Sequence, residues 1–239
     1  MDNMKCRVSV AMTSYNGEKY IHKQLSSVLS NLGTNDEVVI SDDGSTDNTI
    51  SIVEKFDDPR RKLIIGPQKG LVENFEHVIR CCSGEYIFLC DQDDVWYNNK
   101  IDKVLDVFSK TNSILVEHDA VVVDSQDNII YPSFFIHRRV HSGVIKNFFR
   151  NTYHGCLIAF RSELKEKIFP FPTSGCLHDQ WIGIIADYYG HVFFLEEKLM
   201  EYKRHENNMS SFERLPISRQ LRDRFYLLLQ IIKHIIRRK

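Results

Sequence analysis

The stretch Tyr86-Ile87-Phe88-Leu89-Cys90-Asp91-Gln92-Asp93-Asp94-Val95-Trp96 joins an apolar run to three carboxylates within four positions. The apolar run is typical of a buried strand, and carboxylates gathered at the end of such a strand repel one another and lose hydration. A divalent cation is the simplest way to offset this repulsion. Oxygen ligands suit Mg²⁺ or Mn²⁺, and Mg²⁺ commonly binds one or two carboxylates together with substrate phosphates. The stretch therefore predicts a metal site that serves a nucleotide, with a solvated acidic turn as the alternative.

Short apolar runs alternate with helical patterns around this stretch. The predicted strands are 7–12, 38–41, 63–65 and 86–89. Three helices are predicted between them: the first at 17–32, the second beginning after an N-cap at Asp47, and the third at about 71–81. Three β-α units within 100 residues predict a mostly parallel, doubly wound sheet. Ligands of such sheets bind outside the carboxyl ends of the strands, so the loops 13–17, 42–47 and 91–94 share one rim. These loops contain neither a GxGxxG nor a Walker lysine motif, which argues against the usual dinucleotide site and a P-loop.

The second half of the chain is less regular. Short strands are predicted at 114–117, 120–123, 129–131 and 157–160, and a helix from His178 to Tyr189. No long linker or internal repeat divides the chain. The pattern predicts one domain of two subregions, followed by a helical tail.

Composition limits the class of protein. The chain has 239 residues with 43% apolar content, which is ordinary for a globular protein. Six cysteines without a CxxC pair fit a reducing cytoplasm, and no signal peptide or membrane span is predicted.

Charge is distributed unevenly along the chain. The net charge is −1, but residues 218–239 carry seven basic residues against one acid, a net of +6, which leaves −7 for the remainder. An acidic body argues against nucleic-acid binding. The basic, amphipathic tail predicts contact with an anionic membrane surface, while packing on the domain or on a second subunit remains an equal alternative.

Five motifs in this order resemble the inverting family-two glycosyltransferases of the GT-A fold, and more narrowly the bacterial enzymes that add rhamnose, glucose or galactose to surface polysaccharides. The motifs are VSVAMTSYNGEKYI (8–21), VVISDDGSTDNT (38–49), GEYIFLCDQDDVW (84–96), HDQW (178–181) and YKRHENN (202–208). The resemblance covers about residues 6–212. It implies a mixed, mostly parallel α/β sheet flanked by helices. It also implies a GT-A domain at 1–215, with a nucleotide-sugar half at about 1–115 and an acceptor half at about 116–215, and a tail at 216–239.

The resemblance also implies roles for the rim residues. Thr13 and Tyr15 would flank the base or ribose, and Asp43 would accept a hydrogen bond from the nucleobase. Lys69 would meet the pyrophosphate at a helix amino terminus, with a solvated lysine as the alternative. The metal, Mn²⁺ or Mg²⁺, would be held by four side chains, of which Asp91 would also contact the nucleotide: Asp91, Asp93, Asp94 and His205.

Asp179 resembles the family's catalytic base, although His178 stands where the family usually has a glutamate. A base on the face opposite the leaving group removes the proton of the attacking hydroxyl, and a helix cap is the alternative for Asp179. A mobile lid with Lys203 and Arg204 would cover the diphosphate. The acceptor pocket would be lined by the following residues, with core packing as the alternative for Trp96: Trp96, His154, Gly155, His178 and Trp181.

The predicted function is metal-dependent, inverting transfer of a hexose from a nucleotide sugar to a saccharide. UDP-glucose or UDP-galactose is favoured as donor and dTDP-rhamnose stays open, and the acceptor is expected to be an undecaprenyl-diphosphate-linked O-antigen or capsule intermediate. The protein would act in the cytoplasm at the inner face of the membrane, and its oligomeric state is not predicted. A sugar-nucleotide nucleotidyltransferase is the rival enzyme, but residues 13–17 contain no Arg or Lys. A non-catalytic binding module is the rival from another class.

Overall fold

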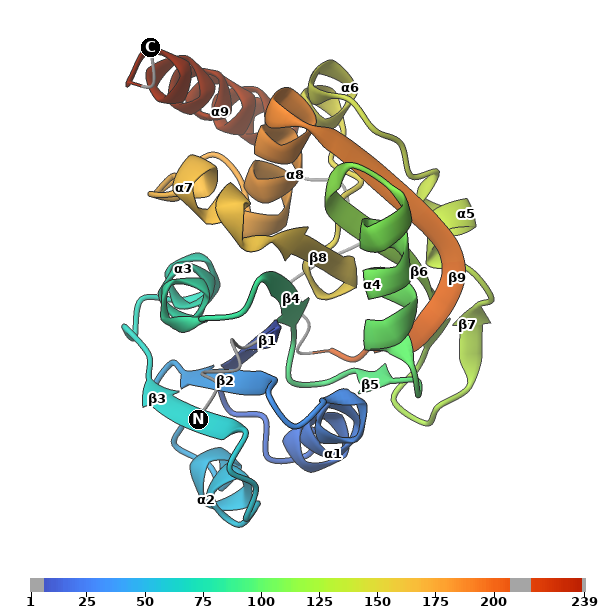
Figure 1. The fold of residues 1–239 in the computed structure, drawn as a ribbon. Coiled ribbons are helices and arrows are strands. Elements are labelled where there is room, and N and C mark those ends of the chain that lie inside the picture. The colour runs from blue at the N-terminus through green and yellow to red at the C-terminus, as the bar shows by residue number, and fades with distance from the viewer. Residues whose placement is uncertain (1–6, 207–215, 238–239) are drawn as a thin grey trace.

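The structure is a computed structural model that describes residues 7–206 and 216–237. The predicted contributions of Cys6, Asn207, Asn208, Arg238 and Lys239 lie outside the described residues, and so does the end of the predicted lid at 207–208. The described chain folds around one curled sheet with the strand order β3-β2-β1-β4-β8-β6-β9-β5, and β7 pairs with β6 (Figure 1).

The strands are β1 (Val8–Ser14), β2 (Glu37–Asp42), β3 (Arg61–Ile65), β4 (Tyr86–Cys90), β5 (Val95–Trp96), β6 (Ser113–Val123), β7 (Ile129–Tyr131), β8 (Ile158–Arg161) and β9 (His191–Lys203). The helices are α1 (Ile21–Asn31), α2 (Thr49–Glu54), α3 (Leu71–Cys81), α4 (Lys100–Lys110), α5 (Phe134–Arg138), α6 (Val144–Phe149), α7 (Lys165–Ile168), α8 (His178–Tyr189) and α9 (Ile217–Arg237).

The first half of the sheet is parallel, as predicted. Strand β1 pairs in parallel with β2 and β4, and β2 pairs in parallel with β3. Ser14 stands opposite Asp42, and Met12 stands opposite Cys90, so the carboxyl ends of these strands meet at one edge. The loops after β1, β2 and β4 therefore form a common rim.

The second half of the sheet is mixed. Strand β8 runs antiparallel to both β4 and β6, and β6 runs parallel to β9. The strands predicted at 114–117 and 120–123 are one strand, β6, whose register against β9 shifts near His118 and Asp119. This irregularity interrupts the alternation of side chains and makes one strand read as two.

Several elements were not predicted, and helix α4 and strand β9 are the longest of them. Helix α4 has a buried face with Ile101, Val104 and Phe108 at helical spacing, so the sequence did contain its signal. Strand β9 has an apolar first part but the run Glu196-Glu197-Lys198 in its middle. Three charged residues in succession are atypical of a strand interior, and for this reason the sequence pattern did not predict β9.

The core lies on both faces of the sheet. On one face Val10, Met12 and Ile40 pack with α1 and α4. On the other face Ala11 and Val39 pack with α3 and α8. Adjacent strand residues enter different clusters because side chains alternate across a strand. The sheet is thus covered on both faces, and ligand access is left to its edge.

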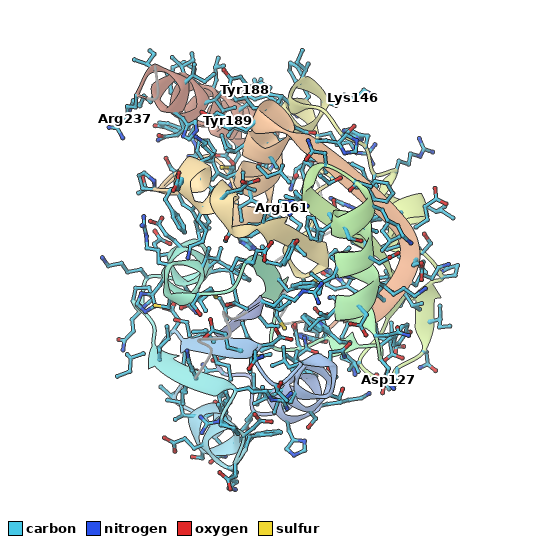
Figure 2. The ribbon with its side chains drawn as sticks, viewed as in Figure 1. Asp127, Lys146, Arg161, Tyr188, Tyr189 and Arg237 are labelled. Carbon is cyan, nitrogen blue, oxygen red and sulfur yellow. The ribbon has the colours of Figure 1, made fainter. Side chains whose placement is uncertain are left out.

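Helix α9 packs on the domain through part of its surface. Leu227 is buried, the His234 ring meets Trp181 edge to face with 5.3 Å between centroids, and Arg224 Nη2 donates to the Phe149 carbonyl at 2.8 Å. Figure 2 shows Tyr188 and Tyr189 of α8 on the same side of the molecule as Arg237 at the end of α9. Of the predicted alternatives, packing on the domain is confirmed.

A second face of α9 is exposed to solvent. Six apolar side chains spaced three or four residues apart are at least 44% exposed: Ile217, Leu221, Phe225, Leu228, Ile232 and Ile236. Among the described helices, none combines the length and the apolar character needed to span a bilayer. Helix α9 therefore joins a packed face to an exposed apolar stripe.

Candidate active site

A cavity of about 760 Å³ opens at the rim of the sheet. It is lined by the loops after β1, β2 and β4, the amino terminus of α3, the turn at Gly155 and the amino terminus of α8. Its charged lining consists of Asp43, Asp91, Asp93 and Asp179, and within the described chain it contains neither Lys nor Arg. The cavity is therefore acidic, and an anionic ligand can bind there only with a cation.

The loop after β1 is held in place by the loop after β4. Tyr15 N donates to Gln92 Oε1 at 2.9 Å, and Gln92 Nε2 donates to the Tyr15 carbonyl at 2.9 Å. Thr13 and Tyr15 both line the cavity, and the Tyr15 side chain is 56% exposed. An exposed aromatic ring at a cavity mouth is suited to stack on a nucleobase.

Asp43 organises the neighbouring loop. Its carboxylate accepts hydrogen bonds from Gln68 N at 2.7 Å and from Gly70 N at 2.8 Å. Gly70 has φ +93, a left-handed conformation that favours glycine. Each carboxylate oxygen keeps a further lone pair for a ligand.

Lys69 differs from its prediction. Its neighbours Gln68 and Gly70 line the cavity, whereas the Lys69 side chain is exposed and does not. Because both flanking amides are turned toward Asp43, the loop presents backbone rather than the lysine ammonium to the cavity.

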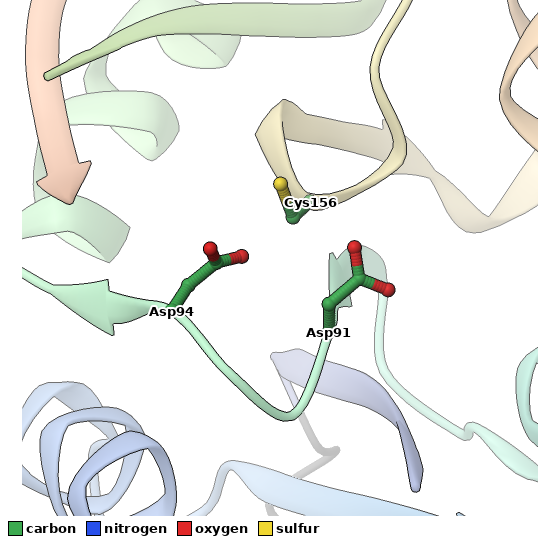
Figure 3. Close-up of side chains that lie close together, drawn as sticks. All are labelled: Asp91, Asp94 and Cys156. Carbon is green, nitrogen blue, oxygen red and sulfur yellow. The ribbon is translucent and has the colours of Figure 1, made fainter. Parts of the chain in front are cut away.

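Three potential metal ligands gather behind the rim. Single ligand atoms of Asp91, Asp94 and Cys156 lie within 4.8 Å of one another (Figure 3). Asp94 is 1% exposed, and its Oδ1 accepts a hydrogen bond from Lys203 N at 3.0 Å. Its Oδ2 is buried with no hydrogen-bond partner among the described residues. A buried, unpartnered carboxylate oxygen fits a divalent cation.

The acidic residues of this group favour their protonated forms unless a cation is bound. Burial, with help from Asp93 and Asp179, raises the pKa of Asp91 to about 8. Burial, with help from Asp93 and Asp91, raises the pKa of Asp94 well above its ordinary value. Burial also raises the pKa of the Cys156 thiol. Deprotonation of such groups needs a positive charge beside them.

Asp93 has a different partner. Its Oδ2 lies 2.7 Å from His205 Nε2, and the His205 ring stacks on Tyr20 with 4.6 Å between centroids. Both Asp93 and His205 line the cavity. The four predicted ligands thus form two groups, Asp91 with Asp94 and Asp93 with His205. Cys156 is a further candidate ligand that the sequence did not predict.

Asp179 begins helix α8 on another wall of the cavity and is 6% exposed. Its Oδ1 accepts hydrogen bonds from Gln180 N at 2.6 Å and from Asn151 Nδ2 at 3.4 Å. Burial raises the pKa of Asp179 to about 6, against the opposing effects of the Gln180 amide, the Arg138 charge and Asn151. Such a carboxylate is ionised at neutral pH and basic enough to accept a proton.

Two neutral histidines stand beside Asp179. Both ring nitrogens of His178, and Nε2 of His154, are buried without a hydrogen-bond partner in the part of the chain described here. Burial lowers the pKa of each ring to about 3. A Cβ atom on Gly155 would lie 2.5 Å from His178 Nε2, so this position requires glycine. Unpartnered neutral imidazoles at a cavity wall are suited to sugar hydroxyls.

Three predicted site residues lie elsewhere. Trp96 is 3% exposed and packs against Phe88, and Trp181 is 2% exposed and donates to the Ile168 carbonyl. Both belong to the core rather than to an acceptor pocket, because their large apolar rings are fully enclosed. Lys203 forms an ion pair with Asp127, so its side chain does not cover the diphosphate, although its backbone amide holds Asp94.

Arg204 lies in a neighbouring cleft. That cleft shares Tyr20 and His205 with the acidic cavity. The Arg204 guanidinium donates to the Tyr202 hydroxyl at 3.1 Å. Its predicted contact with the diphosphate stays a prediction.

Asn151 and Arg138 were missed by the sequence analysis. Asn151 had no motif around it, and its role appears only through its contact with Asp179. The sequence did contain a signal for Arg138 as a member of a basic segment, because residues 128–162 contain no Asp or Glu.

Comparison with known proteins identifies related chains. The family model Glycosyl transferase family 2 matches residues 9–169. The dTDP-rhamnosyl transferase RfbG of Shigella flexneri is 29% identical over 216 residues, which cover 82% of this chain and 72% of RfbG. A UDP-Glc:alpha-D-GlcNAc-diphosphoundecaprenol beta-1,3-glucosyltransferase of Escherichia coli, WfgD, is 29% identical over 185 residues, which cover 75% of this chain and 70% of WfgD.

Solved structures share the fold. The S. aureus TarS 1–349 complex with UDP-GlcNAc has a TM-score of 0.73 at 20% identity, and the match covers 91% of this chain and 64% of TarS 1–349. The mannosyltransferase PcManGT from Pyrobaculum calidifontis, in complex with GDP-Man and Mn²⁺, has a TM-score of 0.65 at 21% identity, and the match covers 86% and 59% of the two chains. This chain therefore spans less than two thirds of the length of these structures.

Proposed function

The chain belongs to glycosyl transferase family 2, and from this premise we propose that it transfers a hexose from a nucleotide sugar to a hydroxyl of a saccharide acceptor with inversion at the anomeric carbon. The observation that carries the proposal is the arrangement of aspartates around one cavity. Asp91 and Asp93 follow β4, whereas Asp179 comes from α8 and binds Asn151 and Gln180 instead. One cavity thus offers a cation site for a leaving diphosphate and a separate carboxylate for an arriving hydroxyl.

Asp179 is the proposed general base. Its carboxylate is fixed by the Gln180 amide and by Asn151, which leaves further lone pairs for the acceptor proton. As the hydroxyl attacks the anomeric carbon, Asp179 takes its proton, and a β-linked product is expected from an α-linked donor. The neutral rings of His154 and His178 hold sugar hydroxyls on the same wall.

A divalent cation fits the carboxylates beside Asp179. Asp91, Asp93 and Asp94, with His205 and Cys156 nearby, are the candidate ligands for Mn²⁺ or Mg²⁺. When bound there, the cation supplies Lewis-acid stabilisation for the departing nucleoside diphosphate. The unpartnered Asp94 oxygen and the absence of Lys and Arg from the described cavity lining support this assignment.

The nucleoside of the donor is assigned to the rim formed by Thr13, Tyr15 and Asp43. We propose UDP-glucose or UDP-galactose as donor, with dTDP-rhamnose as the next candidate, since the names of the relatives include both UDP-Glc and dTDP-rhamnosyl transfer. The neutral histidines beside Asp179 favour a neutral hexose over a uronic acid, because a buried carboxylate on the sugar would lack a cationic partner there.

The proposed acceptor is a sugar linked through a diphosphate to undecaprenol, the chemistry that the name of WfgD states for that protein. Such an acceptor lies in the cytoplasmic membrane, so transfer is placed at its inner face. The exposed stripe of α9 and its flanking arginines, among them Arg219 and Arg222, support contact with an anionic bilayer.

A donor panel tests the proposed reaction. Purified protein is incubated with each nucleotide sugar, a GlcNAc-diphospho-lipid analogue and Mn²⁺, and the products are resolved by mass spectrometry. One donor is expected to give a hexose-extended lipid, and EDTA is expected to stop its formation. Absence of transfer and of nucleoside diphosphate release with every donor would refute the proposal.

A further inference from the structure

The segment from 128 to 162 differs from the rest of the acidic body. It contains Arg138, Arg139, Lys146, Arg150 and Arg161 and no Asp or Glu. Helices α5 and α6 belong to this segment, and α6 lies next to α9, where Arg224 binds the Phe149 carbonyl (Figure 1). This basic segment contrasts with the acidic remainder of the body, and its exposed charges include Arg139, Lys146 and Arg150.

Two arginines of this surface are held together. Arg150 Nη2 donates to the carbonyl of Arg138 at 3.0 Å, and Arg138 Nη2 points to the carbonyl of Asn151 at 3.5 Å. The charge of Arg150, together with burial, lowers the pKa of Arg138. Neither Arg138 nor Arg150 has an ion pair with a carboxylate in the described chain. Two guanidinium groups near each other that form no ion pair with a carboxylate are suited to a doubly charged anion.

Asn151 connects this pair of arginines to the proposed catalytic base, Asp179. Asn151, whose carbonyl faces Arg138, donates its side-chain amide to Asp179 at 3.4 Å. Burial chiefly lowers the pKa of His154, and the charges of Arg138 and Arg204 add to this effect, so both guanidinium groups are near His154. Arg138 and Arg150 themselves are not part of the cavity lining. They therefore lie just beyond the wall that carries Asp179 and His154.

We propose that Arg138 and Arg150, assisted by Arg204, bind the diphosphate that joins the acceptor sugar to its lipid. This inference rests on the proposed function. The acceptor sugar would place its hydroxyl at Asp179 and its diphosphate beyond the cavity wall, at the arginines. The donor diphosphate is assigned to the other wall, with Asp91 and Asp93, so the two diphosphates of the reaction have separate sites.

Exposed apolar side chains lie close to the two arginines in the sequence and are not part of the cavity lining. Ile136 on α5 is 80% exposed, and Ile145 and Phe149 on α6 are 75% and 58% exposed. Beyond a diphosphate site, such side chains fit the lipid that follows the phosphate. With the acceptor hydroxyl at Asp179 and the diphosphate at the arginines, the lipid would contact these apolar side chains.

The test compares two acceptors that differ in charge. One is an α-GlcNAc-diphosphoryl alkyl lipid, and the other is an α-GlcNAc glycoside of the same alkyl chain without phosphate. The single variants Arg138→Gln and Arg150→Gln and the double variant are assayed with both. For the double variant, KM for the diphosphoryl acceptor is expected to rise about 10- to 100-fold, the range for lost charge-assisted hydrogen bonds. KM for the phosphate-free acceptor and for the nucleotide sugar are expected to stay unchanged.

Lys146→Gln is the matched control. Lys146 is exposed on α6 within the same acid-free run, and Figure 2 shows it at the surface. It is expected to leave KM for both acceptors at the wild-type value. Without this control, the rise in KM for the diphosphoryl acceptor could be attributed to the loss of any positive charge on this segment.

Each remaining outcome overturns the inference. Equal rises in KM for both acceptors would mean that the arginines bind the acceptor sugar or position Asp179 rather than bind the diphosphate. If KM for both acceptors is unchanged and the variants bind less to vesicles that contain phosphatidylglycerol, the arginines contact the headgroups of the bilayer rather than the acceptor. If the wild-type protein transfers sugar to neither acceptor, the proposed function fails. If it transfers to both and the variants leave the KM ratio unchanged, this inference alone fails.

Discussion

The raised pKa of Asp179 predicts that the proposed transfer reaction is sensitive to mild acid. With a pKa of about 6, the base is about 90% ionised at pH 7 and about 9% ionised at pH 5. Because only the carboxylate can accept the proton of the acceptor, kcat/KM is expected to fall about tenfold between pH 7 and pH 5. An aspartate with an ordinary pKa would remain more than about 90% ionised at pH 5 and would cause almost no loss.

The variant Asp179→Asn tests the source of this dependence. Its amide oxygen can still accept from Gln180 N, so the start of α8 is preserved. Loss of a general base is expected to lower kcat by about 10²- to 10⁴-fold, and with Mn²⁺ saturating at both pH values the residual rate should not change between pH 5 and pH 7. Binding of the nucleotide sugar, measured by calorimetry at both pH values, is expected to be unaffected because the nucleoside rim lies on another wall.

Asp187→Asn is the control on the same helix. Asp187 binds the Tyr153 hydroxyl and Gly143 N, lies outside the cavity lining, and also has a pKa raised by burial. It is expected to alter thermal stability but to retain the pH midpoint near 6. Wild-type activity in Asp179→Asn, or a wild-type profile that is flat from pH 5 to pH 7, would contradict the assignment of Asp179 as the base.

Three further predictions concern the metal ligands, a buried lysine and the tail helix. Asp93→Ala is expected to weaken UDP binding in Mn²⁺ at least about tenfold and to leave metal-free binding unchanged, as measured by calorimetry; an equal loss in EDTA would exclude a metal-linked role. Lys100 is buried with a pKa lowered to about 8, so Lys100→Met is expected to raise the free energy of unfolding at pH 7 by up to about 3 kcal/mol. Between pH 8 and 10.5 the unfolded chain holds a proton on Lys100 that the folded chain lacks, so in urea titrations the stability of the wild type should rise with pH relative to that of Lys100→Met. The exposed Lys110→Met serves as its control, and a destabilised Lys100→Met would oppose the reasoning. The double variant Phe225→Ser, Ile232→Ser keeps the packed face of α9 and is expected to float less with anionic vesicles; flotation equal to wild type would remove the membrane contact.

The rim of the cavity was predictable from sequence because its residues lie close together along the chain. Apolar runs end directly at Asp43 and Asp91, and parallel pairing then brings those ends to one edge. Asp179 also had a local signal, since it stands where a helical pattern begins. In each case short-range pattern and sheet topology were sufficient.

The errors have a different origin. Trp96 and Trp181 were assigned to a sugar pocket by residue type, but the burial of a tryptophan depends on which elements cover it, and a single sequence does not show that. Lys203 was assigned by its place in a motif, whereas its ammonium group pairs with Asp127, 76 positions earlier. Cys156 joins Asp91 and Asp94 through the packing of β8 beside β4, a contact between segments about 65 residues apart. Such contacts depend on tertiary packing that spacing in the sequence does not reveal.

Strand β9 limits how this chain can be divided into exchangeable parts. It starts after α8 and ends at Lys203, whose amide donates to Asp94, and His205, which follows, contacts Asp93. The matched family region ends at 169, before these contacts and before Asp179. A chimera that takes residues up to 115 from one relative and the remainder from another would therefore combine Asp93 and Asp94 of one parent with Lys203 and His205 of the other. Exchange of acceptor specificity by recombination should succeed only when the end of β9 is inherited together with the loop after β4.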